Sequence, residues 1–145
     1  MRALIQRVNS SKVYINKKEY SSIKHGMLIL LGITQNDSVD KIKKLVNKII
    51  NLRIFPSNDK NMDQSVIDIN GSILVVSQFT LYGNCEKGRR PSFVNAEQPD
   101  RAKILYEKFI REIESKNINV KQGKFGSEMQ IHIENNGPVT LMLEL

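Results

Sequence analysis

Three hydrogen-bonding side chains directly follow an apolar run near the middle of the chain. The run is Ile73-Leu74-Val75-Val76, and the polar residues after it are Ser77, Gln78 and Thr80. Polar groups at the end of a buried strand need hydrogen-bond partners. They either satisfy the strand end itself, or form the lip of a pocket with hydroxyl and backbone N–H groups directed at a ligand. These residues alone favour neither interpretation.

A second concentration of chemically active groups is basic. The segment Lys87-Gly88-Arg89-Arg90-Pro91-Ser92-Phe93 holds three cations. Adjacent arginines between a glycine and a proline cannot both lie on a packed face, so the segment is predicted to contact phosphates. The chain has 22 Lys and Arg against 15 Asp and Glu, a net charge of +7, which favours a partner with negative charge.

Arg7 and the segment Asn135-Asn136-Gly137-Pro138 are unusual in their surroundings. Arg7 falls on the face of an alternating segment whose other side chains are small or apolar. The pattern favours an arginine at the rim of the protein, with its aliphatic stem buried and its guanidinium in water. The Asn-Gly pair lies between two alternating runs and predicts a two-residue hairpin. Pro138 removes a hydrogen-bond donor there, and a bond before proline can be cis, which exposes the carbonyls on either side.

Several chemistries are disfavoured by what the sequence lacks. The only histidines are His25 and His132 and the only cysteine is Cys85, so we expect no metal site, no internal disulfide and no cofactor. Neither the G-x-S-x-G motif nor the phosphate-loop motif occurs. A triad of Ser77 with His132 is a minor alternative.

The apolar pattern predicts two helices and several short strands in one domain, residues 1–145, without repeats or linkers. One helix is capped by Asp37 or Ser38 and the other starts near Pro99-Asp100 and ends near Ser115. The lysines of the first helix are interpreted as a solvated face, in preference to a surface that contacts RNA. Strands are predicted over residues 3–8, 13–15, 20–23, 27–33, 65–69, 73–76, 118–120, 129–133 and 139–143, with a tight hairpin turn at Asn70-Gly71 before residues 73–76.

The longest uninterrupted apolar run, Met27 to Leu31, is too short to cross a bilayer. Nothing at the N-terminus resembles a signal peptide. A soluble, cytoplasmic protein without a membrane partner is therefore expected.

Three segments, in this order and spacing, resemble the D-aminoacyl-tRNA deacylase (D-tyrosyl-tRNA(Tyr) deacylase) family. They are Met1 to Val8, Ser77-Gln78-Phe79-Thr80-Leu81 followed by Lys87 to Phe93, and Asn136-Gly137-Pro138-Val139-Thr140. The similarity runs the whole length of the chain. It implies an α/β fold of the α+β type, with an antiparallel or mixed, barrel-like sheet core, two main helices and a homodimer.

The resemblance also implies the activity. Members of this family hydrolyse the ester that joins a D-amino acid to the 3′ end of tRNA, and glycyl-tRNA is accepted as well. The implied partners are the aminoacylated 3′ end and the acceptor stem of tRNA, and DNA is not among them. Phe79 favours the D-specific branch, because a sister branch that edits L-alanine has alanine there.

Site roles follow from the resemblance, residue by residue. The pocket wall and catalytic set are Ser77, Gln78, Phe79 and Thr80. Gly137-Pro138 matches a Gly–cis-Pro turn that enters the partner subunit's pocket, and Arg7 matches the arginine that orients this turn. The terminal adenosine is contacted by Phe125, Gly126 and Met129. The acceptor-stem phosphates are contacted by Lys87, Arg89 and Arg90.

Two alternatives to this picture are kept. Thr80 as a covalent nucleophile ranks below attack by water, or attack assisted by the neighbouring ribose hydroxyl, because the sequence offers no base to activate Thr80. A non-catalytic RNA-binding module ranks below the enzyme, because aromatic residues are 6% of the chain and most fall at apolar-periodic positions.

Overall fold

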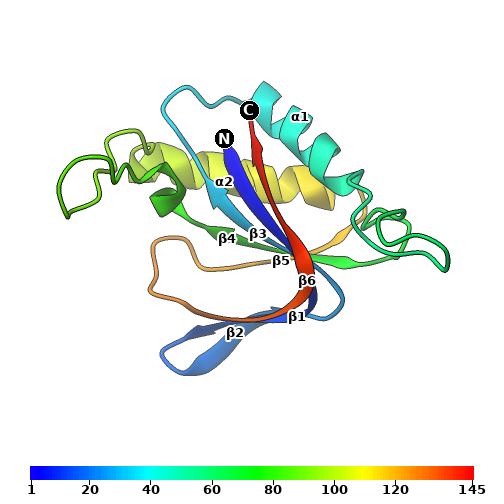
Figure 1. Cartoon of the computed structure of the whole chain (residues 1–145). Coiled ribbons are helices and arrows are strands. Elements are labelled where there is room, and N and C mark those ends of the chain that lie inside the picture. Colours follow the sequence, from blue (N-terminus) through cyan, green and yellow to red (C-terminus); the bar gives the residue numbers. More distant parts are fainter.

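The computed structural model describes residues 1–145 and is organised by a six-stranded mixed sheet (Figure 1). The strand order is β2-β1-β3-β4-β5, and β6 pairs with β1 as well. β1 is antiparallel to its three neighbours, whereas β3, β4 and β5 run parallel to one another. The strands are β1 (Arg2–Ile15), β2 (Lys18–Ile23), β3 (Gly26–Gly32), β4 (Ser72–Ser77), β5 (Asn119–Gln122) and β6 (Gln130–Glu144).

β1 is one continuous strand, where two separate strands over residues 3–8 and 13–15 were predicted. Residues 2–8 pair with β3 and residues 11–15 pair with β2, while β6 follows β1 along both parts. The long pair of β1 and β6 curves and so bends the sheet toward closure, as the path of β6 shows (Figure 1). The mixed, barrel-like sheet with two helices is confirmed.

The hairpin predicted at Asn135 to Pro138 is wrong. β6 continues through this segment, and Gln6 pairs with Thr140 while Val8 pairs with Asn135. Residues 136–139 therefore stand opposite the single residue Arg7, which makes the segment a bulge. Proline suits a bulge because it has no N–H to give to the ladder. The Gly137-Pro138 peptide bond is cis.

The hairpin predicted at Asn70-Gly71 is also wrong. Residues 65–69 form no strand, because Gly71 N–H donates to Val66 O (2.9 Å) and Asn70 N–H to Ile67 O (3.0 Å) in successive turns. β4 then pairs in parallel with β3 and β5. The tight hairpin of the chain is at Asn16 and Lys17, whose φ angles of 49° and 64° fit the type I′ turn between β1 and β2.

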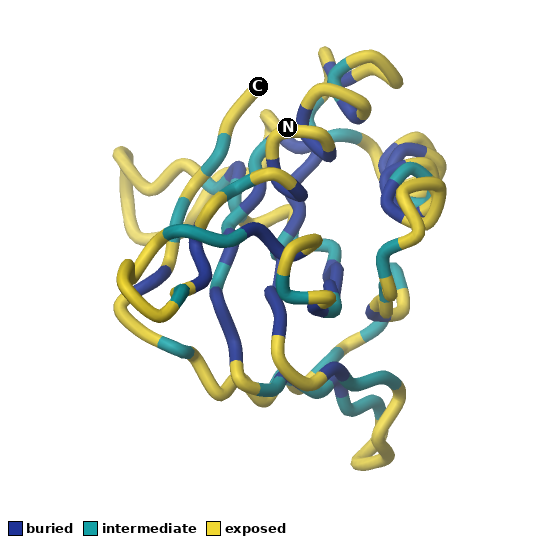
Figure 2. Tube along the Cα trace, turned by 90° about the vertical axis from the view of Figure 1, so that its right-hand side faces the viewer, coloured by how far each residue is buried: buried dark blue, intermediate teal, exposed yellow.

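Both helices, α1 (Val39–Ile50) and α2 (Pro99–Glu114), pack on one face of the sheet (Figure 1). Both were predicted, and Ser38 is the cap of α1, with its hydroxyl accepting from Lys41 N–H. Their apolar faces join the sheet in a core cluster of 24 buried residues. The buried positions gather on the strands and on the sides of the helices that face them (Figure 2).

A second, smaller cluster of six buried residues fills the other face of the sheet, inside its curl. β4 contributes to both clusters, since Ile73 and Val75 face the helices while Leu74 and Val76 face the curl. This alternation follows the strand period of two. The residues that end β4 therefore stand between two packed layers.

No helix has both the length and the apolar character that crossing a membrane requires.

Candidate active site

The carboxyl ends of three parallel strands meet at one edge of the sheet. Parallel strands place these ends side by side, and this is where such sheets commonly bind ligands. The chain continues there from β3, β4 and β5 into residues that surround a cavity of about 380 Å³. Its walls are Leu31, Ile33, Ser77, Gln78, Phe79, Phe93, Ala96, Glu97, Gln98, Pro99, Ala102, Phe125 and Gly126. We call this space the first cavity.

The residues after β4 turn sharply at the mouth of this cavity. Gln78 N–H donates to Leu31 O (2.8 Å), so the ladder to β3 extends one residue beyond the strand. A short 3₁₀ turn, η1 (Phe79–Tyr82), follows, and Leu81 N–H donates to Gln78 O (3.2 Å). The first N–H groups of a helical turn have no acceptor within it. The sequence analysis predicted no helical turn here.

Phe79 stands at the mouth with its side chain 57% exposed. Its only ring partner is Phe93, edge to face, with the centroids 5.0 Å apart. Phe93 was singled out only as the end of the basic segment, so its place in the cavity wall was missed. An exposed aromatic pair beside a cavity offers a face to a planar ligand.

A second cavity of about 350 Å³ lies beyond the same residues. Its walls are Val76, Ser77, Gln78, Phe79, Gly126, Ser127, Glu128, Met129 and Ile131. The two cavities share four wall residues, Ser77, Gln78, Phe79 and Gly126. Of these two cavities, Phe125 lines only the first and Met129 only the second. The structure therefore separates these two residues, although the resemblance gave both to the adenosine.

Thr80 lines neither cavity. Its side chain is exposed, and its hydroxyl accepts a hydrogen bond from the amide of Gln78. His132 is also absent from both walls, since its ring packs on Tyr14 with the centroids 4.8 Å apart. Neither arrangement resembles a nucleophile held by a base.

The prediction that Arg7 is a rim residue with its head in water is wrong. Arg7 is only 7% exposed, and its guanidinium donates to main-chain oxygens on both sides. Nη1 donates to Ile54 O at 2.6 Å, while Nε donates to Asn136 O at 3.2 Å. Nη2 donates to Asn136 Oδ1 (3.1 Å) and, at 3.5 Å, to Gly137 O. Arg7 thus fixes the bulge that carries Gly137 and Pro138, with Asn136 as a partner that sequence reasoning missed.

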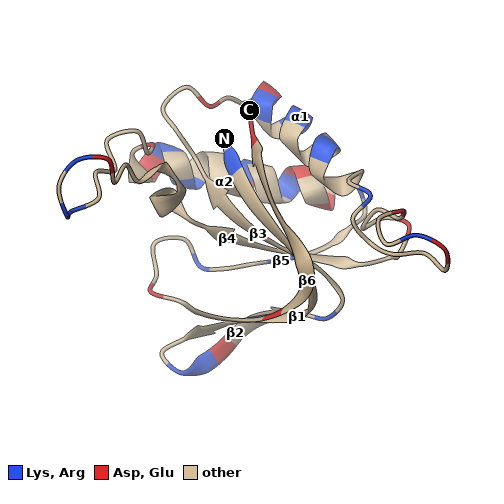
Figure 3. Cartoon of the chain, viewed as in Figure 1, with Lys and Arg blue, Asp and Glu red and all other residues tan.

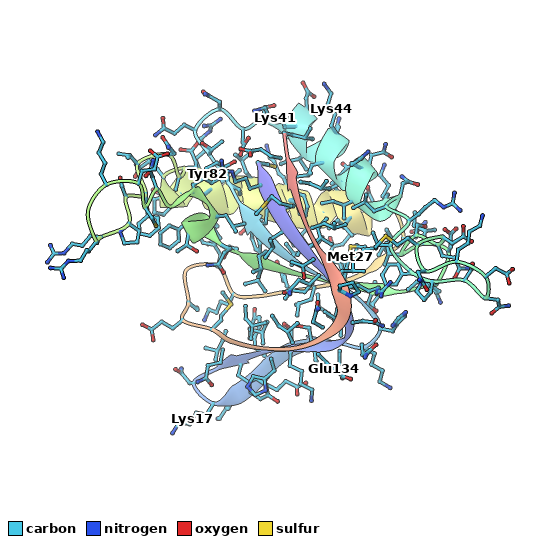
Figure 4. All side chains as sticks on the ribbon, in the orientation of Figure 1. Lys17, Met27, Lys41, Lys44, Tyr82 and Glu134 are labelled. Atoms are coloured by element: carbon cyan, nitrogen blue, oxygen red, sulfur yellow. The ribbon has the colours of Figure 1, made fainter.

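Arg7 and Ser77 are far apart in one protomer. On β3, Arg7 pairs with Met27 and Ser77 pairs with Leu31, so four residues separate the two levels. Four residues of extended strand span about 13 Å. Figure 4 labels Met27, which pairs with Arg7, on the right, and Tyr82, which ends η1, at upper left. Gly137 and Pro138 line neither cavity.

Arg2, the first residue of β1, supports η1. Its Nη1 donates to Leu81 O (2.8 Å), its guanidinium lies 4.6 Å from the centre of the Tyr82 ring, and its Nε pairs with Glu144 (2.9 Å). Burial of Tyr82, followed by the nearby carboxylate of Asp37, raises the pKa of the Tyr82 hydroxyl to about 12. The turn is therefore held at its end as well as at its start.

The basic segment forms a loop that projects beside the first cavity. Asn84 and Ser92 close it with two main-chain hydrogen bonds of 2.8 and 2.9 Å. Lys87, Arg89 and Arg90 are exposed and belong to none of the ion pairs of the structure. They are the blue tip at the far left of Figure 3. Phe93, which follows this loop, connects it to the wall of the first cavity.

Comparison with known proteins places this fold and site in the class of aminoacyl-tRNA ester hydrolases. The family described as D-Tyr-tRNA(Tyr) deacylase matches residues 4–144, and the chain belongs to this family. A D-aminoacyl-tRNA deacylase of Thermosipho melanesiensis is 52% identical over 145 residues, which cover 99% of this chain and 97% of that protein. One of Clostridium botulinum is 51% identical over 144 residues, with the same coverage of 99% and 97%. The family inferred from the sequence is confirmed.

Solved structures agree with the fold. A structure named c-Myc DNA Unwinding Element Binding Protein has a TM-score of 0.94 and 38% identity, and the match covers 100% of this chain and 99% of that one. A probable eukaryotic D-amino acid tRNA deacylase has a TM-score of 0.84, with the match covering 99% and 98% of the two chains. At 20% identity, this second likeness concerns the fold alone.

Proposed function

We propose that the chain, a single domain over residues 1–145, deacylates D-aminoacyl-tRNA as a homodimer in which each subunit lends its Gly137-Pro138 turn to the other's pocket. The turn reads the handedness of the amino acid. The observation that carries this proposal is the position of Arg7. It holds the turn rigidly at a level of the sheet about 13 Å along the strand from Ser77, beyond reach of the pocket in the same chain.

The turn selects by main-chain geometry. The carbonyls of Gly137 and Pro138 accept hydrogen bonds from the α-ammonium of the substrate, because charge-assisted bonds of this kind are strong and directional. A D side chain then points to solvent, while an L side chain points into the turn and is rejected sterically. Many D-amino acids fit, since a pocket that does not touch the side chain cannot discriminate by it. Glycyl-tRNA fits as well, because glycine has no side chain.

The chemistry is ester hydrolysis without a protein nucleophile. Water attacks the acyl carbon, alone or assisted by the neighbouring ribose hydroxyl, and the bond between that carbon and the ribose oxygen breaks to give the free amino acid and tRNA. The backbone N–H groups of Phe79 and Thr80 stabilise the developing oxyanion, each by about 3–4 kcal/mol where the geometry is right. Ser77 and Gln78 complete the wall that positions the ester.

The two cavities divide the substrate between them. The first cavity has mostly apolar walls and suits the terminal adenosine, which would lie against Phe125 and Gly126. Met129 lies in the second cavity, on the side of the aminoacyl group. Ser77, Phe79 and Gly126 stand between them, where the ester must lie.

The partner we propose is tRNA in the cytoplasm, where aminoacyl-tRNA is used, with no role for DNA or a membrane. Lys87, Arg89 and Arg90 are free of internal ion pairs and would contact phosphates of the acceptor stem. Such contacts are indifferent to sequence, so specificity comes from the ester and its amino acid.

Turnover tests the proposal. D-tyrosyl-tRNA is expected to be hydrolysed far faster than L-tyrosyl-tRNA, and a non-catalytic RNA-binding module would hydrolyse neither. Pro138→Ala is expected to reduce the ratio of D to L turnover, because proline restricts the backbone that aims the two carbonyls. An unchanged ratio would contradict selection by the turn.

Mixed dimers test the exchange between subunits. One subunit carries Pro138→Ala and the other Phe79→Ala, and the two are purified together with different affinity tags. If the turn acts on the partner's pocket, one site of the mixed dimer combines an intact pocket with an intact turn and keeps D-selective turnover. If it acts within its own chain, both sites are defective and selectivity is lost.

A further inference from the structure

The largest hollow of the molecule that we describe has no role in the reaction above. It holds about 500 Å³ between α2, the start of β2 and the end of β5. We call it the α2 groove and define it by Tyr20, Lys103, Arg111, Lys124 and Phe125. Phe125 is also a wall of the first cavity, so the two spaces are neighbours across one aromatic ring.

The floor of the α2 groove is firmly built. The hydroxyl of Tyr106, a buried residue, donates to Val75 O (2.8 Å) and lies 3.3 Å from Gly123 O. Gly123 N–H donates to Val75 O (2.8 Å), which ties the segment after β5 to β4. The Tyr106 and Phe125 rings pack with their centroids 5.7 Å apart. The shape of the groove therefore exists without a ligand.

The rim of the groove carries cations without partners. Lys103, Arg111 and Lys124 are exposed and take part in none of the ion pairs of the structure. Two carboxylates, those of Glu107 and Glu114, also face the groove and are not paired either. The cations outnumber the carboxylates, so the groove has a net positive charge.

An aromatic side chain completes the rim. Tyr20 is 49% exposed at the groove, a large exposure for a ring that packs on no other ring of the structure. Exposed rings beside cations are the means by which proteins hold single-stranded nucleic acid, with bases stacked on the rings and phosphates near the cations.

We propose that the α2 groove binds the two single-stranded nucleotides that precede the terminal adenosine of tRNA. This inference rests on the function proposed above, with the adenosine in the first cavity against Phe125. The chain of the RNA would then pass over Phe125 into the groove, where Lys103 and Lys124 meet the two linking phosphates and Tyr20 stacks on a base.

Two other surfaces fit this role less well. The hollow at the tip of the β1–β2 hairpin offers one cation, Lys17, against one carboxylate, Glu128, and so has no net charge. The outward face of α1, a helix with blue basic positions in Figure 3, carries Lys43, Lys44 and Lys48, but none of them lines any of these cavities.

Short substrates isolate the groove from the rest of the tRNA. The D-tyrosyl ester of adenosine fills only the first two cavities, whereas the D-tyrosyl ester of the trinucleotide CCA reaches the groove as well. The unaltered protein is expected to have a kcat/KM at least about tenfold higher for the trinucleotide ester. The combined variant Lys103→Ala, Arg111→Ala and Lys124→Ala is expected to lose this advantage through a raised KM, with the adenosine ester changed by less than about twofold.

Two single substitutions give independent readings. Tyr20→Leu removes the ring and is expected to lower kcat/KM for the trinucleotide ester only. Glu107→Gln removes a carboxylate that repels phosphate, so it is expected to raise kcat/KM for the trinucleotide ester. A gain of this kind does not arise from damage to the fold.

The matched control is Lys43→Ala, Lys44→Ala and Lys48→Ala on α1, which removes the same charge from a surface without a groove. Equal losses in the control and in the groove variant would overturn the proposal, as would equal kcat/KM values for the two short esters in the unaltered protein. Failure of the unaltered protein to hydrolyse any D-tyrosyl ester, full tRNA included, would instead overturn the proposed function and this inference with it.

Discussion

The side chain of Thr80 distinguishes two possible mechanisms of hydrolysis. Its hydroxyl bonds to the amide of Gln78, and no acid or base is placed to activate it. Thr80→Ala keeps the backbone N–H and removes only the hydroxyl. We expect kcat for D-tyrosyl-tRNA to fall by less than about tenfold.

Ser77→Ala is the matched control, because Ser77 lies in the walls of both cavities whereas Thr80 lies in neither. We expect the larger loss of kcat in this variant. A fall of Thr80→Ala to the uncatalysed rate, with tRNA binding intact, would restore Thr80 as the nucleophile.

Arg7 holds the turn through a fork that lysine cannot reproduce. Its three nitrogens reach Ile54 O, Asn136 O and Asn136 Oδ1 at once, and lysine has a single nitrogen. We expect Arg7→Lys to lower the ratio of D to L turnover by about tenfold, because a loosened turn admits L side chains. The free energy of unfolding is expected to fall by about 1–3 kcal/mol, since the variant lacks hydrogen bonds that a buried charge makes.

Arg53→Lys is the control for this variant. Arg53 donates to both the main chain and the carboxylate of Asp63, but it is exposed and does not contact the turn. Its ratio of D to L turnover should match that of the unaltered protein. A loss of stability in Arg7→Lys with an unchanged ratio would show that Arg7 is only a structural residue.

Residues near one another in sequence were easier to assign than residues brought together by the fold. Ser77 and Gln78, which line both cavities, were singled out because polar groups follow directly on an apolar strand. Arg7 was misplaced because its partner Asn136 is 129 residues away, and no local pattern shows that this residue buries the guanidinium. Phe93 was likewise hidden, since its contact with Phe79 depends on the closure of the basic loop.

At the scale of elements, the helices were predictable and the turns were not. The apolar period of α1 and α2 is a local property, so both helices were recovered, α1 with its cap and α2 with both ends. Asn-Gly favours a tight turn only where the flanking strands pair with each other. Residues 130–135 and 140–144 pair with β1 instead, so the pair at Asn136-Gly137 became part of a bulge.

η1 gives the fold a sensitivity to alkaline pH. Tyrosine ionises near pH 10 in an unfolded chain, whereas burial raises the pKa of Tyr82 to about 12 in the native protein. Between these values the unfolded state has lost a proton that the native state keeps, so native stability falls as the pH rises. Burial raises the pKa of Tyr106 as well, and acts in the same direction.

We expect Tyr82→Phe to remove the part of this alkaline loss of stability that comes from the Tyr82 hydroxyl. Between pH 10 and 11.5 the free energy of unfolding of the variant should fall less steeply, by up to about 1.4 kcal/mol per pH unit. Urea unfolding at a series of pH values measures both slopes. Parallel curves for the two proteins would show that the Tyr82 hydroxyl is not protected by the fold.

At the scale of the whole molecule, the functional parts lie at opposite ends of one sheet. The carboxyl ends of β3, β4 and β5 build the pocket, and the bulge in β6 lies at the level where β3 and β4 begin. A rigid sheet keeps this distance fixed, which is why the function proposed above takes the turn for each pocket from a second copy of the chain. The same arrangement leaves the basic loop and the α2 groove available to RNA.

The basic loop should govern the salt dependence of the reaction with full-length tRNA. Removing one cation that neutralises a phosphate reduces the slope of log kcat/KM against log salt concentration by about 0.7–0.9. We expect the combined variant Lys87→Ala, Arg89→Ala and Arg90→Ala to reduce this slope by about 2.1–2.7. Hydrolysis of the adenosine ester should keep its rate, because that substrate has no acceptor stem. If the basic-loop variant kept the slope with tRNA while the α1 control variant reduced it, we would infer that the acceptor stem binds at α1 and not at the basic loop.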